Sequence, residues 1–269
     1  MNKSIIVVIF FLSLLCSTLV AQVDSQWRGP NRDGKYQNEK LLKSWPPNGP
    51  KLYATLTDLG KGYSSPAVTK DRIYVTGMED GKGNLFAFDI SGKLVWKKNY
   101  GREWDDSYPG ARISPTVVGN RIYFASSLGQ IYCYNPNGDM IWTLDMKAEF
   151  DAPIIEWGMV ESLLIEGDYL FCTPGSEDVS IAVLDRHSGK IINKIEGNGQ
   201  KSAYCSPTII NHNGRKILIT MLAESLIGVD LKSMKMIFEH EHTTDYDIHP
   251  NTPLYYDGFI YIVSGYGTG

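Results

Sequence analysis

The strongest constraint on this chain is an internal repeat of short strands. The repeated segments are YSSPAVTKDRIYVTG, RISPTVVGNRIYFAS, ESLLIEGDYLFCTPG, YCSPTIINHNGRKILITM and NTPLYYDGFIYIVSG. Aligning their second strands on Tyr74, Tyr123, Leu170, Leu218 and Tyr261 gives intervals of 49, 47, 48 and 43 residues. Apolar and polar residues alternate between turn residues, which is typical of β-strands. A four-strand unit with this period predicts the blades of a β-propeller.

The second half of each unit is an outer hairpin that recurs in phase. The four copies are FAFDISGKLVW (86–96), YCYNPNGDMIW (132–142), AVLDRHSGKIIN (182–193) and IGVDLKSMKMIF (227–238). We expect the Asp or Asn to cap its own turn, Gly to accept positive φ, and Trp to fill the space between blades. Asn193 and Phe238 replace the Trp in the last two copies. The predicted blade-docking residues are Asp89, Gly92, Trp96, Asn135, Gly138, Trp142, Asp185, Gly189 and Asp230.

The repeat predicts an all-β propeller of four-stranded antiparallel blades. Four complete blades are expected at 62–100, 111–146, 160–196 and 203–241, and part of a fifth at 250–269, within a repeat region that covers 61–269. A fifth blade of two strands leaves an open edge, so we expect a fragment of a ring of about seven or eight blades. Residues 22–60 form an N-terminal segment, in which 41–58 is predicted to be a strand that completes the last blade and closes the ring.

The first 21 residues have the features of a secretory signal peptide. Lys3 precedes an apolar run from Ile5 to Leu15, and small residues lead to an expected cleavage after Ala21. Cys16 raises lipoprotein anchoring as an alternative, which Leu15 disfavours because that position resembles one that takes a small residue. We therefore expect export to the periplasm or beyond.

Charge and cysteine content limit the classes of function. With 26 basic and 30 acidic residues and no basic block, nucleic-acid binding is not expected. Cys133, Cys172 and Cys205 remain after the signal peptide, and each lies in an apolar run. We expect buried free thiols rather than a zinc site or a vicinal disulfide, since no two of them are adjacent or in CxxC spacing.

These features resemble the pyrroloquinoline-quinone (PQQ)-like repeat propellers. The hairpin with Ala87, Asp89, Gly92, Lys93 and Trp96 is similar to that family's tryptophan-docking motif, A-x-D-x-x-T-G-K-x-x-W, shortened by one residue at the turn. The segment QWRGPNRDG (26–34) is similar to the start of many secreted bacterial members of unassigned function. The superfamily includes quinoprotein alcohol dehydrogenases and a lipoprotein subunit of the outer-membrane β-barrel assembly machine.

The resemblance implies two functions. The first is a binding or scaffolding protein of the bacterial cell envelope, which holds a periplasmic protein, a peptide or a carbohydrate, with a structural subunit of an envelope complex as a variant. The second is a quinoprotein dehydrogenase that oxidises alcohols or sugars with PQQ and Ca²⁺. That family also has a vicinal Cys-Cys pair, which is not present in this sequence.

Two long inter-blade loops carry the candidate ligand-binding residues. Loops 100–114 and 147–162 mix aromatic side chains, which can stack on sugars or peptides, with charged groups that can bind polar partners. Ordinary loop packing is the alternative for each residue. We expect Arg112 and Glu161 to point into the central funnel, where they either pair with each other or, for Arg112, bind a PQQ carboxylate. The candidates are Trp104, Asp106, Tyr108, Arg112, Trp157, Glu161 and Tyr204.

The histidine-rich segment FEHEHTTDYDIHP (238–250) is the candidate metal site. Strand alternation places His240 and His242 on one face, an arrangement that a metal site could use. The alternative is the solvated end of an outer strand. No metal ligand set is assigned, and no serine nucleophile motif or phosphate-binding loop is predicted.

Overall fold

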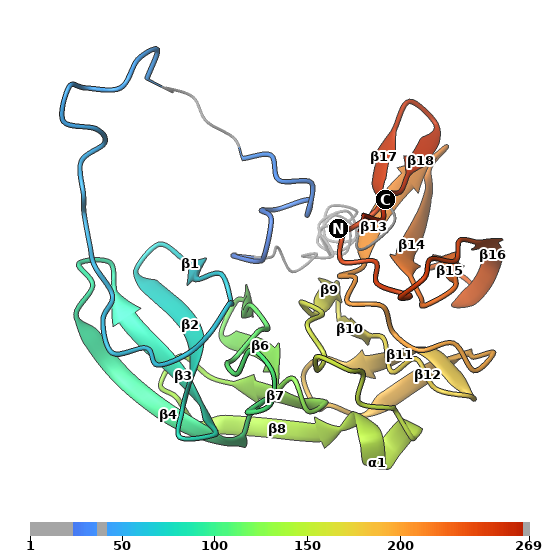
Figure 1. Cartoon of the computed structure of the whole chain (residues 1–269), viewed down its shortest axis with the longest axis horizontal. Coiled ribbons are helices and arrows are strands. Elements are labelled where there is room, and N and C mark those ends of the chain that lie inside the picture. The colour runs from blue at the N-terminus through green and yellow to red at the C-terminus, as the bar shows by residue number, and fades with distance from the viewer. Residues whose placement is uncertain (1–23, 37–41, 266–269) are drawn as a thin grey trace, which may run out of the picture.

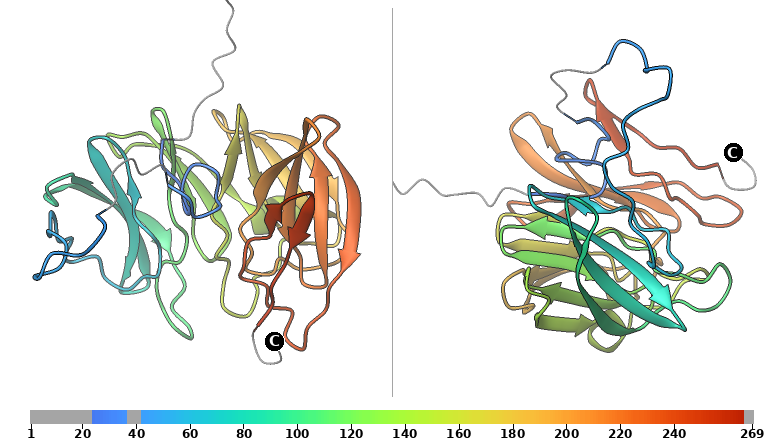
Figure 2. Two further views of the ribbon diagram at one scale, coloured as in Figure 1. Left: turned by 90° about the horizontal axis from the view of Figure 1, so that it is seen from above. Right: turned by 90° about the vertical axis from the view of Figure 1, so that its left-hand side faces the viewer.

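Short strands separated by turns form four consecutive antiparallel sheets and the start of a fifth. The computed structural model describes residues 24–36 and 42–265. The predicted signal peptide, its cleavage site and Cys16 lie outside these residues. The sheets follow one another around an arc, each roughly edge-on to the central axis (Figure 1), and the side views show them standing next to each other (Figure 2). The prediction of an all-β propeller with four blades and part of a fifth is confirmed.

Each of the four complete sheets has four strands in sequence order. The first contains β1 (Ala67–Val68), β2 (Arg72–Glu79), β3 (Lys82–Asp89) and β4 (Leu94–Arg102). The second contains β5 (Thr116–Val118), β6 (Arg121–Ala125), β7 (Gln130–Tyr134) and β8 (Met140–Asp145). The third contains β9 (Leu164–Glu166), β10 (Tyr169–Cys172), β11 (Val179–Asp185) and β12 (Ile191–Glu196). The fourth contains β13 (Thr208–His212), β14 (Arg215–Met221), β15 (Ser225–Asp230) and β16 (Lys235–Glu241). The last sheet has two strands, β17 (Leu254–Tyr256) and β18 (Phe259–Tyr261).

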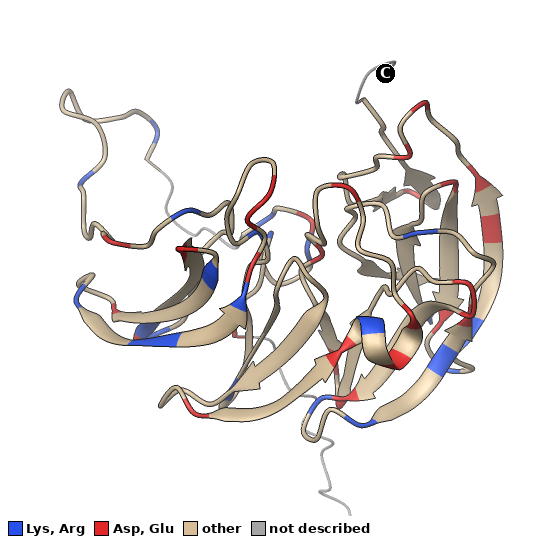
Figure 3. Ribbon diagram, turned by 60° about the horizontal axis from the view of Figure 1, so that its bottom comes forward, with Lys and Arg blue, Asp and Glu red and all other residues tan. Residues whose placement is uncertain are grey.

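Burial explains the two kinds of strand sequence. The third strands β3, β11 and β15 are continuous buried runs because both of their faces are covered. A sheet lies on each side of β11 and β15, whereas β3 has the second sheet on one side and Leu56 and Leu59 of the N-terminal segment on the other. The outer strands β8 and β12 alternate between more and less exposed positions because one face meets solvent. Acidic and basic residues are interspersed along the turns and outer strands (Figure 3).

The strand register corrects the repeat alignment in two copies. Tyr74 pairs with Ala87, which pairs with Trp96. In the third sheet the residue opposite Val183, and thus in line with Asn193, is Phe171 rather than Leu170. The corresponding residue of the fourth sheet is Ile219 rather than Leu218, since Ile219 pairs with Gly228 and Gly228 with Phe238. Both neighbours are apolar in each copy, so hydrophobicity alone did not distinguish them.

The indole of Trp142 joins the second sheet to the third. Its Nε1 donates to the carbonyl of Arg186 at 3.0 Å, and its ring lies 6.2 Å from that of Tyr123. Gly189 has φ +72°, and a Cβ on it would lie 2.7 Å from the indole, so only glycine fits. Asp185 holds this turn by accepting from the backbone N–H of Ser188 at 2.7 Å. The contact therefore consists of an indole packed against a turn glycine of the next sheet.

The first and second sheets are joined in the same way. Trp96 Nε1 donates to the carbonyl of Pro136 at 2.9 Å, and a Cβ on Gly138 would lie 3.1 Å from its ring. Gly92 is the corresponding turn glycine of the first sheet, and the N-terminal segment lies against it where the other turn glycines face an indole. A Cβ on Gly92 would lie 3.1 Å from Ala54. Residues 42–58, the described part of the predicted strand 41–58, do not form a strand. The ring-closing role of this segment stays a prediction.

One short helix was not expected. Helix α1 (Met146–Phe150) begins directly after β8, where Asp145 caps it by accepting from the backbone N–H of Lys147 and Ala148. Asp151 ends it in the left-handed conformation. Within 24–36 and 42–265, the structure has no helix of the length and hydrophobicity needed to cross a membrane.

The three cysteines of the described chain are buried and free, as the sequence predicted. Burial raises the pKa of Cys133 to about 12 and that of Cys205 to about 11. Thiols with such pKa values are protonated at neutral pH and react slowly.

We expect Trp142→Ala to lower the free energy of unfolding by about 3–5 kcal/mol, because it leaves a cavity between two sheets and an unpaired carbonyl. Ile141→Ala is the matched control, since Ile141 is the preceding residue and is 37% exposed. Its expected cost is below about 1 kcal/mol. Guanidinium unfolding measures both, and equal losses would contradict the assigned role of the indole.

Candidate functional site

The N-terminal segment 24–34 lies against the inner strands, on the concave side of the arc of sheets (Figure 1). Ser25 pairs with Val117 of β5 in both directions, with N–O distances of 3.3 and 2.7 Å. The carboxylate of Asp24 accepts from the backbone N–H of Gly119 at 2.6 Å. The segment therefore runs beside the second blade at the axis of the propeller.

Arg32 anchors this segment to the third and fourth blades. It is 2% exposed. Its Nη1 donates to the carbonyls of Ser162 at 2.8 Å and Pro207 at 3.1 Å, and its Nη2 donates to the carbonyl of Leu163. Its Nε donates to Gln26 Oε1 at 2.9 Å. Burial lowers the pKa of Arg32 to about 10, so the group stays charged at neutral pH.

Glu161 directly precedes Ser162 and Leu163, and its charge opposes the effect of burial on the pKa of Arg32. Its Oε2 accepts from the backbone N–H of Thr173 at 2.9 Å, and its Oε1 is buried without a hydrogen-bond partner among the described residues. Burial raises the pKa of Glu161 to about 7, against the opposing effects of the Thr173 N–H and the Arg32 charge. The carboxyl group therefore titrates near neutral pH.

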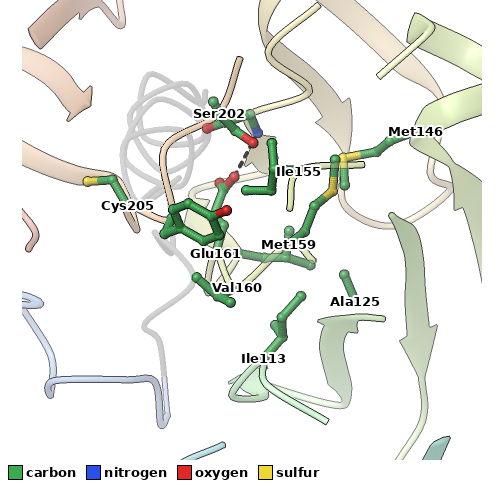
Figure 4. A pocket seen from close by; sticks show the side chains of 12 residues that line it. Ile113, Ala125, Met146, Ile155, Met159, Val160, Glu161, Ser202 and Cys205 are labelled. Carbon is green, nitrogen blue, oxygen red and sulfur yellow. Dashed lines mark hydrogen bonds between the residues drawn. The ribbon is translucent and has the colours of Figure 1, made fainter. Parts of the chain in front are cut away.

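Glu161 borders a small cavity between the second, third and fourth blades. Figure 4 shows its carboxylate beside Ile155, on the side of the cavity where Ser202 lies, with Met159 and then Met146 farther along the lining. The cavity has a volume of about 10 Å³, which is close to the minimum for one water molecule. Its lining consists of Ile113, Ala125, Met146, Ile155, Met159, Val160, Glu161, Leu163, Thr173, Ser202, Tyr204 and Cys205.

Arg112 lies between two aromatic rings at the loop end of the blades. Its guanidinium carbon is 5.2 Å from the ring centre of Tyr63 and 5.9 Å from that of Trp104. Its Nη2 donates to the carbonyls of Tyr108 at 2.6 Å and Ser107 at 3.2 Å. Its Nε is buried without a partner among the described residues. Burial lowers the pKa of Arg112, with the Tyr63 and Glu103 charges acting in the opposite direction.

Glu103 gives this loop its shape. It is 1% exposed and accepts from the Tyr100 hydroxyl at 2.7 Å and from the backbone N–H of Trp104 and Ser127, both at 2.8 Å. Because Ser127 belongs to the second blade, the carboxylate connects the loop to that blade. Burial raises the pKa of Glu103. Its role is to hold Trp104 in position.

Tyr204 connects the Arg112 cluster with the Glu161 cavity. Its ring lies 5.9 Å from that of Trp157, and its hydroxyl accepts from the backbone N–H of Trp157 at 3.4 Å. It lines the Glu161 cavity, and the charge of Arg112 acts on its pKa. Tyr204 has φ +65°, a left-handed conformation that is strained for an aromatic residue. We call Tyr63, Trp104, Arg112, Trp157 and Tyr204 the mouth cluster.

The structure brings together most of the predicted ligand-binding residues. Trp104, Arg112, Trp157 and Tyr204 belong to the mouth cluster, and Glu161 lies below it. Tyr108 contributes its carbonyl, while its side chain is 72% exposed. Asp106 instead accepts from the backbone N–H of Ser107 at 2.7 Å within its own turn. The expected Arg112–Glu161 pair does not form, because backbone carbonyls hold Arg112 and Arg32 is the cation that acts on Glu161.

The histidines are arranged differently from the expected pair. His240 is exposed at the end of β16. His242 Nε2 and His249 Nδ1 both contact the hydroxyl of Ser264, at 2.9 and 2.6 Å, and His249 Nε2 contacts the carbonyl of Ala223 at 2.9 Å. These contacts join the partial fifth blade to the fourth. No group of three His, Cys, Asp or Glu side chains in 24–36 and 42–265 is arranged to hold a metal ion.

Comparison with known proteins identifies the family. A family model described as outer membrane protein assembly factor BamB matches residues 81–268. The chain belongs to this family of PQQ-like repeat propellers.

Two curated relatives match a shorter part. The tricorn protease of Thermoplasma volcanium is 29% identical over 120 residues, which are 45% of this chain and 11% of that protein. A tricorn protease homolog of Saccharolobus solfataricus is 29% identical over 125 residues, 46% of this chain and 11% of the homolog. The chain thus spans about a tenth of the length of these relatives.

Similar solved structures are also propeller proteins. BamB from Moraxella catarrhalis aligns with a TM-score of 0.48 and 16% identity, over 71% of this chain and 50% of that one. Quinohemoprotein alcohol dehydrogenase ADHIIG from Pseudomonas putida HK5 gives 0.47 and 14%, over 65% and 34%. A europium-containing methanol dehydrogenase gives 0.46 and 11%, over 70% and 52%.

The cavity beside Glu161 does not fit the cofactors of the quinoprotein members. A calcium site needs six to eight oxygen ligands from several groups. Glu161 is a single carboxylate close to the Arg32 cation, and its cavity of about 10 Å³ is far smaller than a tricyclic quinone. We therefore derive no step through PQQ or Ca²⁺ from this part of the chain.

Sequence reasoning missed Arg32, Tyr63, Thr173 and Ser202. Arg32 lies in the family-like segment QWRGPNRDG, but its carbonyl partners lie 130 to 175 residues away. Tyr63 and Ser202 each precede a predicted first strand, as Arg112 and Glu161 do. That shared position was the available signal.

We expect Arg32→Met to release the N-terminal segment, because methionine fills space but donates no hydrogen bonds to the three carbonyls. Hydrogen exchange of residues 24–34 should become faster, while the outer strands β4 and β8 keep their protection. Unchanged exchange in 24–34 would show that Arg32 does not hold the segment.

We expect Glu161→Gln to stabilise the protein at pH 8 more than at pH 5. The folded state keeps the Glu161 proton up to about pH 7, whereas the unfolded chain releases it near the ordinary value of 4.5. The unfolding free energy therefore falls as pH rises between these values, and a neutral glutamine does not show this fall. Thermal melts of both proteins at the two pH values measure the difference. A gain that does not depend on pH would contradict the raised pKa.

Proposed function

We propose that the chain is a binding or scaffolding protein of the bacterial cell envelope, and that it holds its partner at the mouth cluster. Membership of the family described as an outer membrane protein assembly factor supports this proposal, as does the signal-peptide pattern of residues 1–21. The partner is a periplasmic protein, a peptide or a carbohydrate.

The observation that carries the proposal is the environment of Arg112. Its guanidinium is enclosed by the rings of Tyr63 and Trp104, and its buried Nε has no partner among the described residues. A buried donor without a partner is costly, and a ligand oxygen that accepts from it recovers this cost. A carboxylate suits this role best, because Arg presents a planar set of donors.

The neighbouring groups extend the same chemistry. Tyr63 is 60% exposed and offers a flat face to a sugar ring or a peptide side chain. Trp157 and Tyr204 form a second aromatic wall, below which Glu161 accepts or donates a hydrogen bond depending on its protonation. Aromatic faces with a few fixed polar groups are typical of recognition sites.

The test compares Arg112→Ala with Arg121→Ala, since Arg121 lies at the opposite end of the second blade, at the start of β6. Tagged proteins are applied to a peptide array and a glycan array. We expect Arg112→Ala to lower the affinity for the wild-type hits about tenfold or more, as the loss of a charged hydrogen bond requires. Arg121→Ala should bind as the wild type does.

Two results would overturn the proposal. One is binding that is insensitive to the Arg112 substitution. The other is PQQ absorbance together with dye-linked alcohol oxidation by the purified full-length protein, which would establish the quinoprotein alternative.

A further inference from the structure

The joint between the third and fourth blades differs from the two joints before it. Trp142 faces a turn glycine, Gly189, across the preceding joint. At the third joint the corresponding pair is Asn193 and Met234. Met234 has the same turn position as Gly189, because the N–H of each donates to the carbonyl of the turn aspartate. Both members of the pair have therefore changed together.

The change removes an aromatic ring from this joint. Asn193 Nδ2 donates to the carbonyl of Met234 at 3.2 Å, so this joint has a hydrogen bond to a different carbonyl of the turn and no indole. In the first two blades the residue in line with the Trp, Tyr74 or Tyr123, has the indole 6.0 or 6.2 Å from its ring. In the third blade that residue is Phe171, which has no indole beside it.

A groove lies at this joint, at the end of the blades opposite the mouth cluster. The turns that border the groove join the first strand of a blade to the second, or the third strand to the fourth. The mouth cluster lies instead on the loops that join one blade to the next. The groove has a volume of about 770 Å³, and most of its lining surface is apolar. Tyr169 is 37% exposed in it, with its ring 6.3 Å from that of Phe171. The lining is Glu166, Gly167, Tyr169, Phe171, Asn213, Gly214, Arg215, Lys216, Asp230, Leu231, Lys232 and Met234.

One basic side chain of the groove, Lys232, is not engaged in an ion pair with another described residue. Arg215 Nε pairs with Asp230 Oδ1 at 2.8 Å, and Lys216 pairs with Glu166. Lys232 is exposed and forms no ion pair with another described residue. The lining therefore has three cations and two paired carboxylates.

Asp168 is a further acidic residue close to the groove in sequence, since it follows Gly167 of the lining. It contacts Arg186 Nη2 at 3.8 Å and His187 Nε2 at 3.1 Å. Its charge is thus directed to the third blade's own turn rather than to Lys232.

We propose that this groove binds an extended segment of a partner protein that carries a tryptophan beside an acidic residue. The tryptophan stacks on Tyr169 and lies against Met234, supplying from the partner the kind of ring that Trp142 supplies within the chain. The acidic residue pairs with Lys232. The groove is separate from the mouth cluster, so the protein holds two partners at opposite ends of its blades.

The test uses fluorescein-labelled peptides of sequence SDWDS, SKWKS and SDADS in anisotropy titrations with the whole chain. We expect SDWDS to bind about tenfold or more tightly than either of the other two, because each lacks one of the two contacts. Tyr169→Ala and Lys232→Glu should each weaken SDWDS about tenfold or more. Arg112→Ala should leave it unchanged, which separates this site from the mouth cluster.

The double variant Asn193→Trp, Met234→Gly is the sharpest test. It places an indole against a turn glycine at the third joint, as Trp142 and Gly189 do at the second. We expect it to raise Tm and to abolish SDWDS binding. Equal affinity for all three peptides, or SDWDS binding that persists in Tyr169→Ala, would overturn the proposal. Tyr169→Ala and Lys232→Glu decide the outcome if the double variant does not fold.

Discussion

The structure depends on contacts between neighbouring sheets, because no sheet of this chain can bury its own two apolar faces. The third strands β3, β11 and β15 are apolar on both sides and need a neighbour on each. The indoles of Trp96 and Trp142 supply the outer part of that contact. Each lies against a turn glycine of the next sheet, which has no Cβ to block it. The Asp or Asn of the turn fixes the backbone, so the carbonyl that accepts from the indole is held in place. A short sequence motif therefore sets the angle between two whole sheets.

At the axis the contacts are made by polar groups. Thr116 Oγ1 donates to the carbonyl of Leu163 at 3.0 Å, and the backbone N–H of Ser162 donates to Ser206 Oγ at 2.9 Å, so hydroxyl groups connect the starts of adjacent inner strands. Arg32 adds three more carbonyl contacts on the same strands. These bonds hold the loop residues before each inner strand, including Glu161. Tyr204 of the mouth cluster lies two residues before Ser206, on this hydrogen-bonded part of the fourth blade, which suits recognition by preformed geometry.

The sequence predicted the fold well and the site in part. Repetition of the turn and Trp pattern established the blades, because each copy is an independent observation of the same local structure. The off-by-one alignment of Phe171 and Ile219 arose because buried strands have no alternation to fix their register. Arg32 could not be predicted, since its hydrogen-bond partners in the third and fourth blades are backbone carbonyls, which no side-chain pattern in the sequence marks. His249 belongs to the predicted histidine-rich segment, but its role in the joint between the fourth and fifth blades was not predicted for a similar reason: its partners are a carbonyl and a serine.

The hydrogen bonds of Arg32 also govern the order in which the chain can fold. They join the start of the chain to residues 130, 131 and 175 positions later, so they form only after the third blade and the first strand of the fourth are in place. The sheets themselves are built from hairpins whose partners are close in sequence and can form early. We therefore expect the N-terminal segment to dock after these blades have formed, as a late step of folding. Until that step, the inner carbonyls of the third and fourth blades remain accessible to water.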